Sequence, residues 1–172
     1  MTTIVVALGA NVAGPWGGPE QALTRARTEL SERGLNIRHW STYYISEPIS
    51  RIKQPRYVNG VLTGTTQLDP LALLRVCKGL ERLAGRRAGP VGAPRPLDID
   101  IVDYGGQVRN WAPRMRRFAS GLILPHPEAH RRAFVLVPLQ EIAPAWRHPV
   151  LGRTPGQLLV ALRPAQVVRR LA

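Results

Sequence analysis

Two aspartates separated by a single residue carry the most specific chemistry in this sequence. They lie in the segment RPLDIDIV, residues 95–102, whose polar and apolar residues alternate as in a strand. Because alternate side chains of a strand share a face, Asp98 and Asp100 are expected to lie side by side, roughly 7 Å apart. Ile99 and Ile101 then enter the core. Neighbouring carboxylates repel each other unless a cation intervenes, and Mg²⁺ prefers a few carboxylate oxygens with phosphates and water. The pair predicts a magnesium site, while a solvated strand face with an arginine partner is the alternative.

A basic loop leads directly into this strand. Residues 86–95 contain two glycines, two prolines and three arginines, Arg86 and Arg95 among them. Phosphoryl transfer requires cations around the phosphate oxygens and closure that excludes water, so this loop suits a phosphate-transfer site. Taken alone, the loop could equally be a flexible surface turn. The sequence has no GxxxxGK[ST] segment, which excludes a P-loop as the phosphate site.

Two further segments hold groups that could bind a ligand. Tyr57 and Asn59 alternate along one strand-like segment, and an aromatic plane beside an amide suits a flat heterocycle rich in donors and acceptors. His126 and His130 are four residues apart in LPHPEAHRR. The prolines around His126 argue against a helical metal-binding pair, so phosphate binding or structural hydrogen bonding is favoured over zinc.

The elements that must position these groups are strands interrupted by helices. Apolar periodicity with Pro19 at the start and Gly34 at the end predicts a helix over residues 19–33, and Asp69-Pro70 starts a second helix that Gly85 ends. Further helices are expected at residues 134–142 and after Thr154-Pro155. Residues 105–121 look irregular and basic. Strands are expected from their β-branched, aromatic or alternating residues at 2–8, 35–46, 57–67 and 97–104.

This order of elements predicts an α+β fold. We expect a ferredoxin-like βαββαβ core with an antiparallel or mixed sheet packed by helices, followed by C-terminal helices. The length is that of a single domain, residues 1–172.

The net charge and the arginine content indicate which classes of ligand the protein binds. The net charge is +13 and the basic residues are almost all arginine, whose planar fork matches phosphate oxygens. Polyphosphate and nucleic acid both fit this charge, although a GC-rich genome also enriches arginine. A nucleic-acid-binding module is suggested by Arg114, Arg116 and Arg117, but no nucleic-acid motif is present and the carboxylate pair argues against it. No apolar run is long enough to span a membrane. A lone Cys77 excludes an internal disulfide and predicts a reducing, cytoplasmic setting.

Together these segments resemble the 6-hydroxymethyl-7,8-dihydropterin pyrophosphokinase family of the folate pathway. The resemblance covers most of the chain, and the aspartate segment preceded by arginine is its most specific part. The segments that carry it, in order, are ALGAN, STYYISEP, YVN, GRR, PRPLDIDIV, LPHP and FVLVPLQEIAP.

The resemblance implies that a pterin hydroxymethyl oxygen attacks the β-phosphorus of ATP and that AMP is released. It also implies a monomer that binds ATP and a pterin alcohol, with two Mg²⁺ ions and no nucleic acid. Catalysis would depend mostly on positioning and charge neutralisation. The implied residues are Arg86, Arg95, Asp98 and Asp100 in catalysis, with both aspartates binding metal; Lys78, Glu81, Ile101, His126 and Arg132 at ATP; and Ser46, Tyr57, Asn59 and Phe134 at the pterin.

One departure bears on the substrate. Family members usually carry a tryptophan and a basic residue where this chain has Gly92 and Val91. Trp111 is one candidate to replace that aromatic lid. The departure leaves a second hypothesis open, that of a paralogue with another pterin substrate or with weak or regulatory activity.

Overall fold

The apolar N-terminal segment forms a central strand of the sheet. The computed structural model describes residues 1–49, 53–90, 92–111, 121–162 and 166–171. Within these ranges β1 (Thr2–Ala10) pairs with β4 (Tyr57–Thr66) on one side and with β5 (Asp98–Tyr104) on the other. β1 suits this position because its residues from Ile4 to Leu8 are buried on both faces.

The remaining described strands extend the sheet beyond β4. β2 (Leu35–Trp40) and β3 (Tyr44–Ser46) both pair with β4, and β6 (Val168–Arg170) pairs with β3. The described order is therefore β5-β1-β4-β3-β6, with β2 also beside β4. Every pairing within the described ranges is antiparallel.

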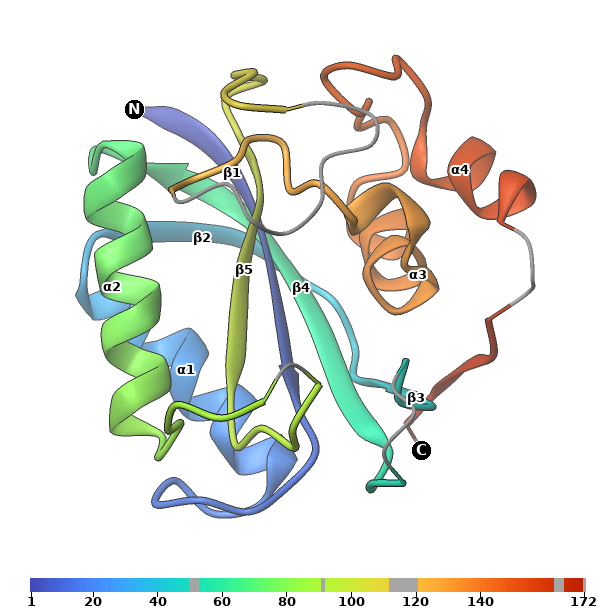
Figure 1. Ribbon diagram of the computed structural model, residues 1–172. Helices are drawn as coiled ribbons and strands as arrows, with labels where there is room; N and C mark the ends of the chain where they lie inside the picture. The colour runs from blue at the N-terminus through green and yellow to red at the C-terminus, as the bar shows by residue number, and fades with distance from the viewer. Residues whose placement is uncertain (50–52, 91, 112–120, 163–165, 172) are drawn as a thin grey trace.

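Helices cover both faces of this sheet (Figure 1). α1 (Pro19–Glu32) and α2 (Pro70–Leu83) lie on one face. The 3₁₀ turn η1 (Ala129–Arg131) leads into α3 (Ala133–Ile142) on the other face, and α4 (Pro155–Ala161) packs on α3. No helix among the described residues is both long and apolar enough to cross a bilayer.

Local sequence accounts for where α2 and α4 begin and α2 ends. The Asp69 carboxylate accepts hydrogen bonds from the backbone N–H groups of Leu71 and Ala72, which α2 cannot satisfy internally. Gly85 follows α2 with a φ of 95°, a conformation that glycine adopts without strain. Thr154 and Gln157 form a reciprocal capping box at the start of α4.

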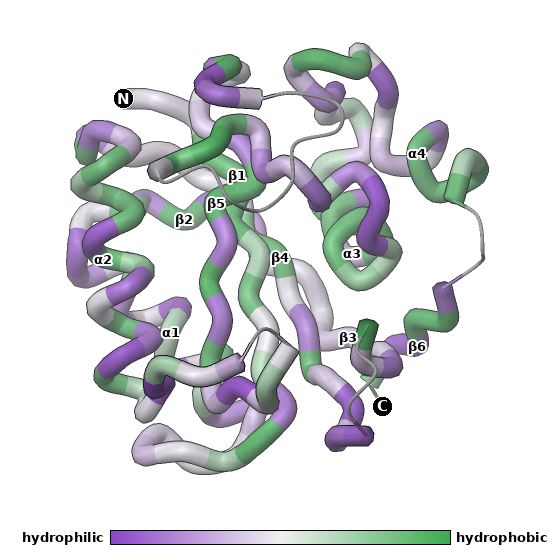
Figure 2. The backbone as a smooth tube through the Cα atoms, viewed as in Figure 1, coloured by the Kyte–Doolittle hydropathy of each residue, from purple (hydrophilic) through white to green (hydrophobic). Residues whose placement is uncertain are grey.

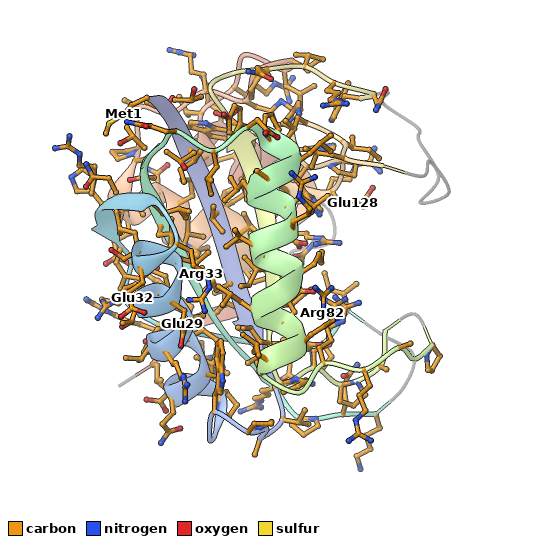
Figure 3. All side chains as sticks on the ribbon, turned by 90° about the vertical axis from the view of Figure 1, so that its left-hand side faces the viewer. Met1, Glu29, Glu32, Arg33, Arg82 and Glu128 are labelled. Atoms are coloured by element: carbon orange, nitrogen blue, oxygen red, sulfur yellow. The ribbon has the colours of Figure 1, made fainter. Side chains whose placement is uncertain are left out.

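The helices bury apolar side chains against opposite faces of the sheet. The larger core includes Leu23 and Leu30 of α1 and Leu73 and Leu80 of α2. The outer surfaces of both helices carry charged residues (Figure 3). The smaller core lies under α3. α3 and this smaller core leave part of that face of the sheet uncovered. Asp98 and Asp100 of β5 lie on the uncovered part.

Two expectations about strands differ from the structure. The single strand predicted at residues 35–46 is two strands, because the pairing with β4 is interrupted at the buried Ser41, whose hydroxyl accepts a hydrogen bond from the Val61 N–H. β6 was not expected, since three exposed or half-buried residues carry no apolar alternation. It forms because β3 offers an unpaired edge. Part of the basic 105–121 segment, with Arg114, Arg116 and Arg117, lies outside the described residues, as does Val91.

Candidate active site

The two aspartates of β5 face a common cavity, as their spacing predicted. Asp98 and Asp100 both line a cavity of about 810 Å³. Ile99 and Ile101 point into the opposite core, with exposed fractions of 1% and 4%. The tube of β5 in Figure 2 alternates accordingly between hydrophilic and hydrophobic residues. A two-residue period thus places both carboxylates on one polar wall.

Arginines from both ends of the preceding loop hold Asp98. The Asp98 Oδ1 atom accepts a hydrogen bond from Arg86 Nη1 at 2.5 Å, and Oδ2 accepts one from Arg95 Nη1. Arg86 also pairs with Glu81 Oε2 at 2.6 Å. The position of the loop is therefore coupled to the charge on Asp98.

Asp100 is contacted from the opposite side, by residues around η1. Arg132 Nη1 lies 3.3 Å and His126 Nε2 3.5 Å from Asp100 Oδ2. Burial by itself raises the pKa of the Asp100 carboxyl, but His126 and Arg132 outweigh burial and hold that pKa below its usual value. The carboxylate form is therefore favoured at neutral pH.

The donor set of this wall fits hard divalent cations that also bind phosphate. Among the described residues both contacts of Asp100 end on Oδ2, so Oδ1 can still accept a ligand. Each oxygen of Asp98 accepts one arginine and retains acceptor capacity, since a carboxylate offers about four lone-pair positions. The described residues contain no group of three or more His, Cys, Asp and Glu that could hold a metal. An ion here would therefore take its other ligands from phosphate and water, as Mg²⁺ does.

The arginine pairs match the alternative reading of the sequence in part. Asp98 and Asp100 do have basic partners, yet both face the cavity rather than open solvent. The two-residue spacing alone could not show whether these carboxylates face a cavity or open solvent.

An aromatic and amide wall lies across the same cavity. Tyr57, Asn59, Ser46 and Phe134 all line it. The buried Asn59 side chain donates to Ser46 Oγ at 3.0 Å and to the Tyr44 carbonyl oxygen at 3.2 Å, which locks its orientation. These groups suit a planar heterocycle with several hydrogen-bonding atoms.

Residues on either side of η1 add to the described lining of this cavity. Arg132 lies over the Phe134 ring at 5.7 Å, and His126 also faces the cavity. Burial lowers the pKa of His126, although the nearby Asp100 partly opposes this effect. The His126 ring accepts a hydrogen bond from the Glu128 N–H at 3.1 Å, a structural contact of the kind the sequence favoured over zinc.

Four residues implied by the family resemblance lie behind the wall. Arg86, Lys78, Glu81 and Ile101 are not among the described residues that line the cavity. The buried Glu81 accepts hydrogen bonds from Lys78 Nζ at 2.7 Å and from the Ile99 N–H at 2.8 Å. Burial raises the pKa of Glu81, with Lys78 acting in the opposite direction. In this arrangement Glu81 and its partners support β5 from the α2 side.

Asn11 and Gln54 join the site although the sequence did not single out a role for either. Asn11 Nδ2 donates to Gln54 Oε1 at 2.9 Å, and Asn11 Oδ1 accepts from the Arg95 N–H at 2.7 Å. Gln54 Nε2 in turn donates to the Gly92 carbonyl oxygen at 3.0 Å. The end of β1 is therefore tied to the loops before β4 and β5. For Asn11, its position directly after an apolar strand was the available signal, but its partners Gln54 and Arg95 lie 43 and 84 positions away.

The expected aromatic lid has no replacement from Trp111. Its ring packs instead against His130 and His148, with ring centroids 6.2 Å and 5.8 Å away. Gly92 lines the cavity with a φ of 84°, which a larger side chain would strain. Among the described residues, Gly92 therefore adds no aromatic bulk to this side of the cavity.

Comparison with known proteins assigns the chain to a family. Residues 5–144 match the sequence model of the family described as 7,8-dihydro-6-hydroxymethylpterin-pyrophosphokinase. A Pseudomonas aeruginosa protein, 2-amino-4-hydroxy-6-hydroxymethyldihydropteridine pyrophosphokinase, is 37% identical over 168 residues, which is 98% of this chain and 96% of that protein. The mitochondrial folate synthesis bifunctional protein of Arabidopsis thaliana is 35% identical over 81% of this chain.

Some relatives are much longer than this chain. The match spans 23% of the Arabidopsis protein. Among solved structures, wild-type HPPK-DHPS of Plasmodium falciparum superposes with a TM-score of 0.65 over 92% of this chain and 43% of that one. Its 17% sequence identity supports a shared fold alone. The family match over residues 5–144 and the identity to the Pseudomonas protein show that this chain belongs to the 7,8-dihydro-6-hydroxymethylpterin-pyrophosphokinase family.

Proposed function

We propose that this chain transfers a pyrophosphoryl group from Mg·ATP to 6-hydroxymethyl-7,8-dihydropterin, releasing AMP, in folate synthesis. The observation that carries the proposal is the pairing of two walls in one cavity. Asp98, Asp100, Arg95 and Arg132 form a charged wall, and Tyr57 belongs to the wall that suits a heterocycle. The names of the bacterial relatives support this reaction.

In this reaction the substrate hydroxyl oxygen attacks the β-phosphorus of ATP. The bond between that phosphorus and the oxygen bridging to the α-phosphorus breaks, AMP departs with the electron pair, and the hydroxyl proton passes to solvent. Arg95 and Arg132 would neutralise charge on the phosphate oxygens. Tyr57 and Phe134 would hold the pterin ring between them, with Asn59 and Ser46 at its edge. Because the attacking group is held in place, positioning supplies much of the rate enhancement.

Asp98 and Asp100 would hold two Mg²⁺ ions, and bound Mg²⁺ supplies charge neutralisation along the triphosphate. His126 would contact ATP from the same wall. Lys78, Glu81, Ile101 and Arg86 would act on the nucleotide through the support that they give to β5. Their place behind the cavity favours this indirect role.

The proposal includes several properties of the whole chain. We assign residues 1–172 to one domain and expect a cytoplasmic monomer. We also assign the core formed by β1, α1, β2, β4, α2 and β5 to the ferredoxin-like class, which its antiparallel order β5-β1-β4-β2 supports.

The test is an AMP assay with purified full-length protein. AMP should accumulate with ATP and magnesium only when 6-hydroxymethyl-7,8-dihydropterin is present, and EDTA should stop it. Absence of AMP at saturating magnesium and both substrates would contradict the proposal.

A second candidate is a paralogue that acts on a different pterin alcohol or has weak or regulatory activity. The observation that favours it is Gly92 at the rim of the cavity, where family members usually have a tryptophan nearby. Assaying several pterin alcohols under one condition separates the two. A kcat/KM at least tenfold higher for another alcohol would favour the paralogue.

A further inference from the structure

The C-terminal segment 166–171 connects two sides of the cavity, and it lies beyond the region that matches the family model. β6 pairs with β3, placing Val168 opposite Ser46 of the cavity wall. Just before β6, Gln166 lines the cavity itself and contacts the turn between η1 and α3. The family match ends at residue 144.

Gln166 uses both ends of its side-chain amide on that turn. Its Oε1 atom accepts a hydrogen bond from the Ala133 N–H at 2.9 Å. Its Nε2 atom donates to the Arg131 carbonyl oxygen at 2.8 Å. Two backbone groups on either side of Arg132 are therefore held by one side chain from a distant part of the chain.

The first contact satisfies a backbone donor at the N-terminus of α3. Ala133 is the first residue of α3, and its N–H has no partner within the helix. The N-cap residue Arg132 makes no side-chain capping hydrogen bond within the described part of the chain. Gln166 thus satisfies one of the N-terminal backbone donors of α3 that have no partner within the helix.

The turn that Gln166 holds carries Arg132, which belongs to the charged wall, and leads into Phe134, which belongs to the wall that suits a heterocycle. Arg132 reaches Asp100 Oδ2 at 3.3 Å and lies over the Phe134 ring at 5.7 Å. A rotation of this turn would move the arginine on the charged wall and the ring on the heterocycle wall together. A shift of about 1 Å in a positioned group can lower a rate by about 100-fold.

We propose that Gln166 is a positioning residue for this active site, holding Arg132 and Phe134 through the backbone of the η1–α3 turn. The proposal rests on the proposed function, because it concerns the same two substrates. It assigns a role in catalysis to a segment outside the family match.

The experiment compares Gln166→Ala with Gln157→Ala in the full-length protein. Gln157 is a matched control because its side chain also accepts a backbone hydrogen bond at a helix start, Thr154 N–H at 3.0 Å, but it lies outside the described lining of the cavity. Gln166→Ala should lower kcat/KM for the pterin by about 10- to 100-fold at a temperature well below the Tm. Gln157→Ala should stay within about twofold of the unchanged protein while losing a similar amount in Tm.

Equal kcat/KM values for the two variants would overturn the proposal. The contacts of Gln166 would then matter no more for the reaction than the helix-start contact of Gln157. Gln166→Glu keeps the acceptor for the Ala133 N–H, loses the donor to the Arg131 carbonyl oxygen and adds a negative charge to the cavity lining. The kcat/KM of Gln166→Glu should lie between the values of the unchanged protein and of Gln166→Ala. If Gln166→Ala does not fold, Gln166→Glu replaces it in the comparison. A kcat/KM equal to that of the unchanged protein would then count against the proposal.

A binding measurement separates this proposal from the proposed function. Calorimetric titration with 6-hydroxymethylpterin and a non-hydrolysable ATP analogue requires no turnover. If the unchanged protein binds both ligands without producing AMP, the proposed reaction fails, and weaker binding by Gln166→Ala alone still supports the positioning role. Identical affinities for Gln166→Ala and Gln157→Ala would contradict it.

Discussion

At the scale of single residues, Asp98 and Asp100 share a strand face but depend on different parts of the molecule. Asp98 is held by Arg86 and Arg95, at the two ends of one loop. Asp100 is held from the η1 side, by His126 and Arg132. Because each carboxylate has its own basic partners, the two charges can coexist before any cation binds. The two aspartates of the charged wall are therefore held from two sides, by the loop before β5 and by residues around η1.

Replacing either aspartate by asparagine should abolish most turnover and preserve the fold. Asp98→Asn and Asp100→Asn each remove a charge from the charged wall, and we expect AMP formation to fall by about 100-fold or more. The matched control is Asp103→Asn on the same strand, whose carboxylate accepts from Trp146 Nε1 at 2.9 Å and does not line the described cavity. It should lower the Tm and leave kcat near normal. Unfolding of the Asp98 and Asp100 variants at assay temperature would favour a structural role for the pair.

Arg95→Ala should reduce the rate more than it weakens nucleotide binding. Arg95 lines the cavity beside Asp98, so it can neutralise charge that develops during transfer. We expect kcat to fall by about 100-fold and the Kd for an ATP analogue to rise by less than about tenfold. Single-turnover kinetics with calorimetric binding measures both quantities. The opposite pattern would place Arg95 in ground-state binding.

At the scale of elements, the chain after α3 is organised by a buried histidine. His148 is 1% exposed, and its Nδ1 atom accepts hydrogen bonds from the N–H groups of Val150 and Leu151, both at 3.2 Å. These bonds turn the chain towards α4 and require a neutral ring. Burial lowers the pKa of His148 to about 4, and the nearby His130 contributes in the same direction. The loop before α4 is consequently sensitive to acid.

Lowering the pH from 7 towards 4 should therefore destabilise the fold. The unfolded His148 side chain takes up a proton below about pH 6.5, whereas the folded one does so only near pH 4, so stability present above pH 6.5 is lost between these values. This histidine accounts for at most about 3 kcal/mol of unfolding free energy. Urea unfolding at pH 7 and pH 4.5 measures it, and His148→Gln should shrink the difference between the two pH values. An undiminished difference in that variant would show that other groups cause the acid sensitivity.

At the scale of the whole molecule, the net charge of +13 far exceeds what one cavity requires. Arginines in the described structure serve several purposes. Arg95 and Arg132 face the cavity, Arg33 pairs with Glu29 on α1, and Arg25 lies over Trp16. Surface arginines of this kind attract polyanions without selecting among them.

Binding to duplex DNA should accordingly be non-specific and should disappear with salt. We expect affinity to fall by about 1,000-fold between 50 and 200 mM NaCl. AMP formation should change by less than about threefold over the same range, because the site groups are partly buried and less screened. Fluorescence anisotropy and the AMP assay measure the two effects. DNA binding that survives 200 mM salt would revive the nucleic-acid hypothesis.

Sequence alone was sufficient for the features that depend on neighbours along the chain. The period of two placed Asp98 and Asp100 on one face, and Asp69-Pro70 and Gly85 marked the start and end of α2. Such patterns are local because strand alternation and helix capping involve residues at most a few positions apart.

Only the tertiary structure decided which distant groups meet. The contacts of Asn11 with Gln54, of Arg132 with Asp100 and of Gln166 with the η1–α3 turn span 32 or more positions. The pairing of β6 with β3 and the location of Glu81 behind β5 also depend on how the sheet is assembled. Hydrogen bonds between remote segments leave no periodic trace in a sequence, since their partners are brought together by packing of the core rather than by the chain.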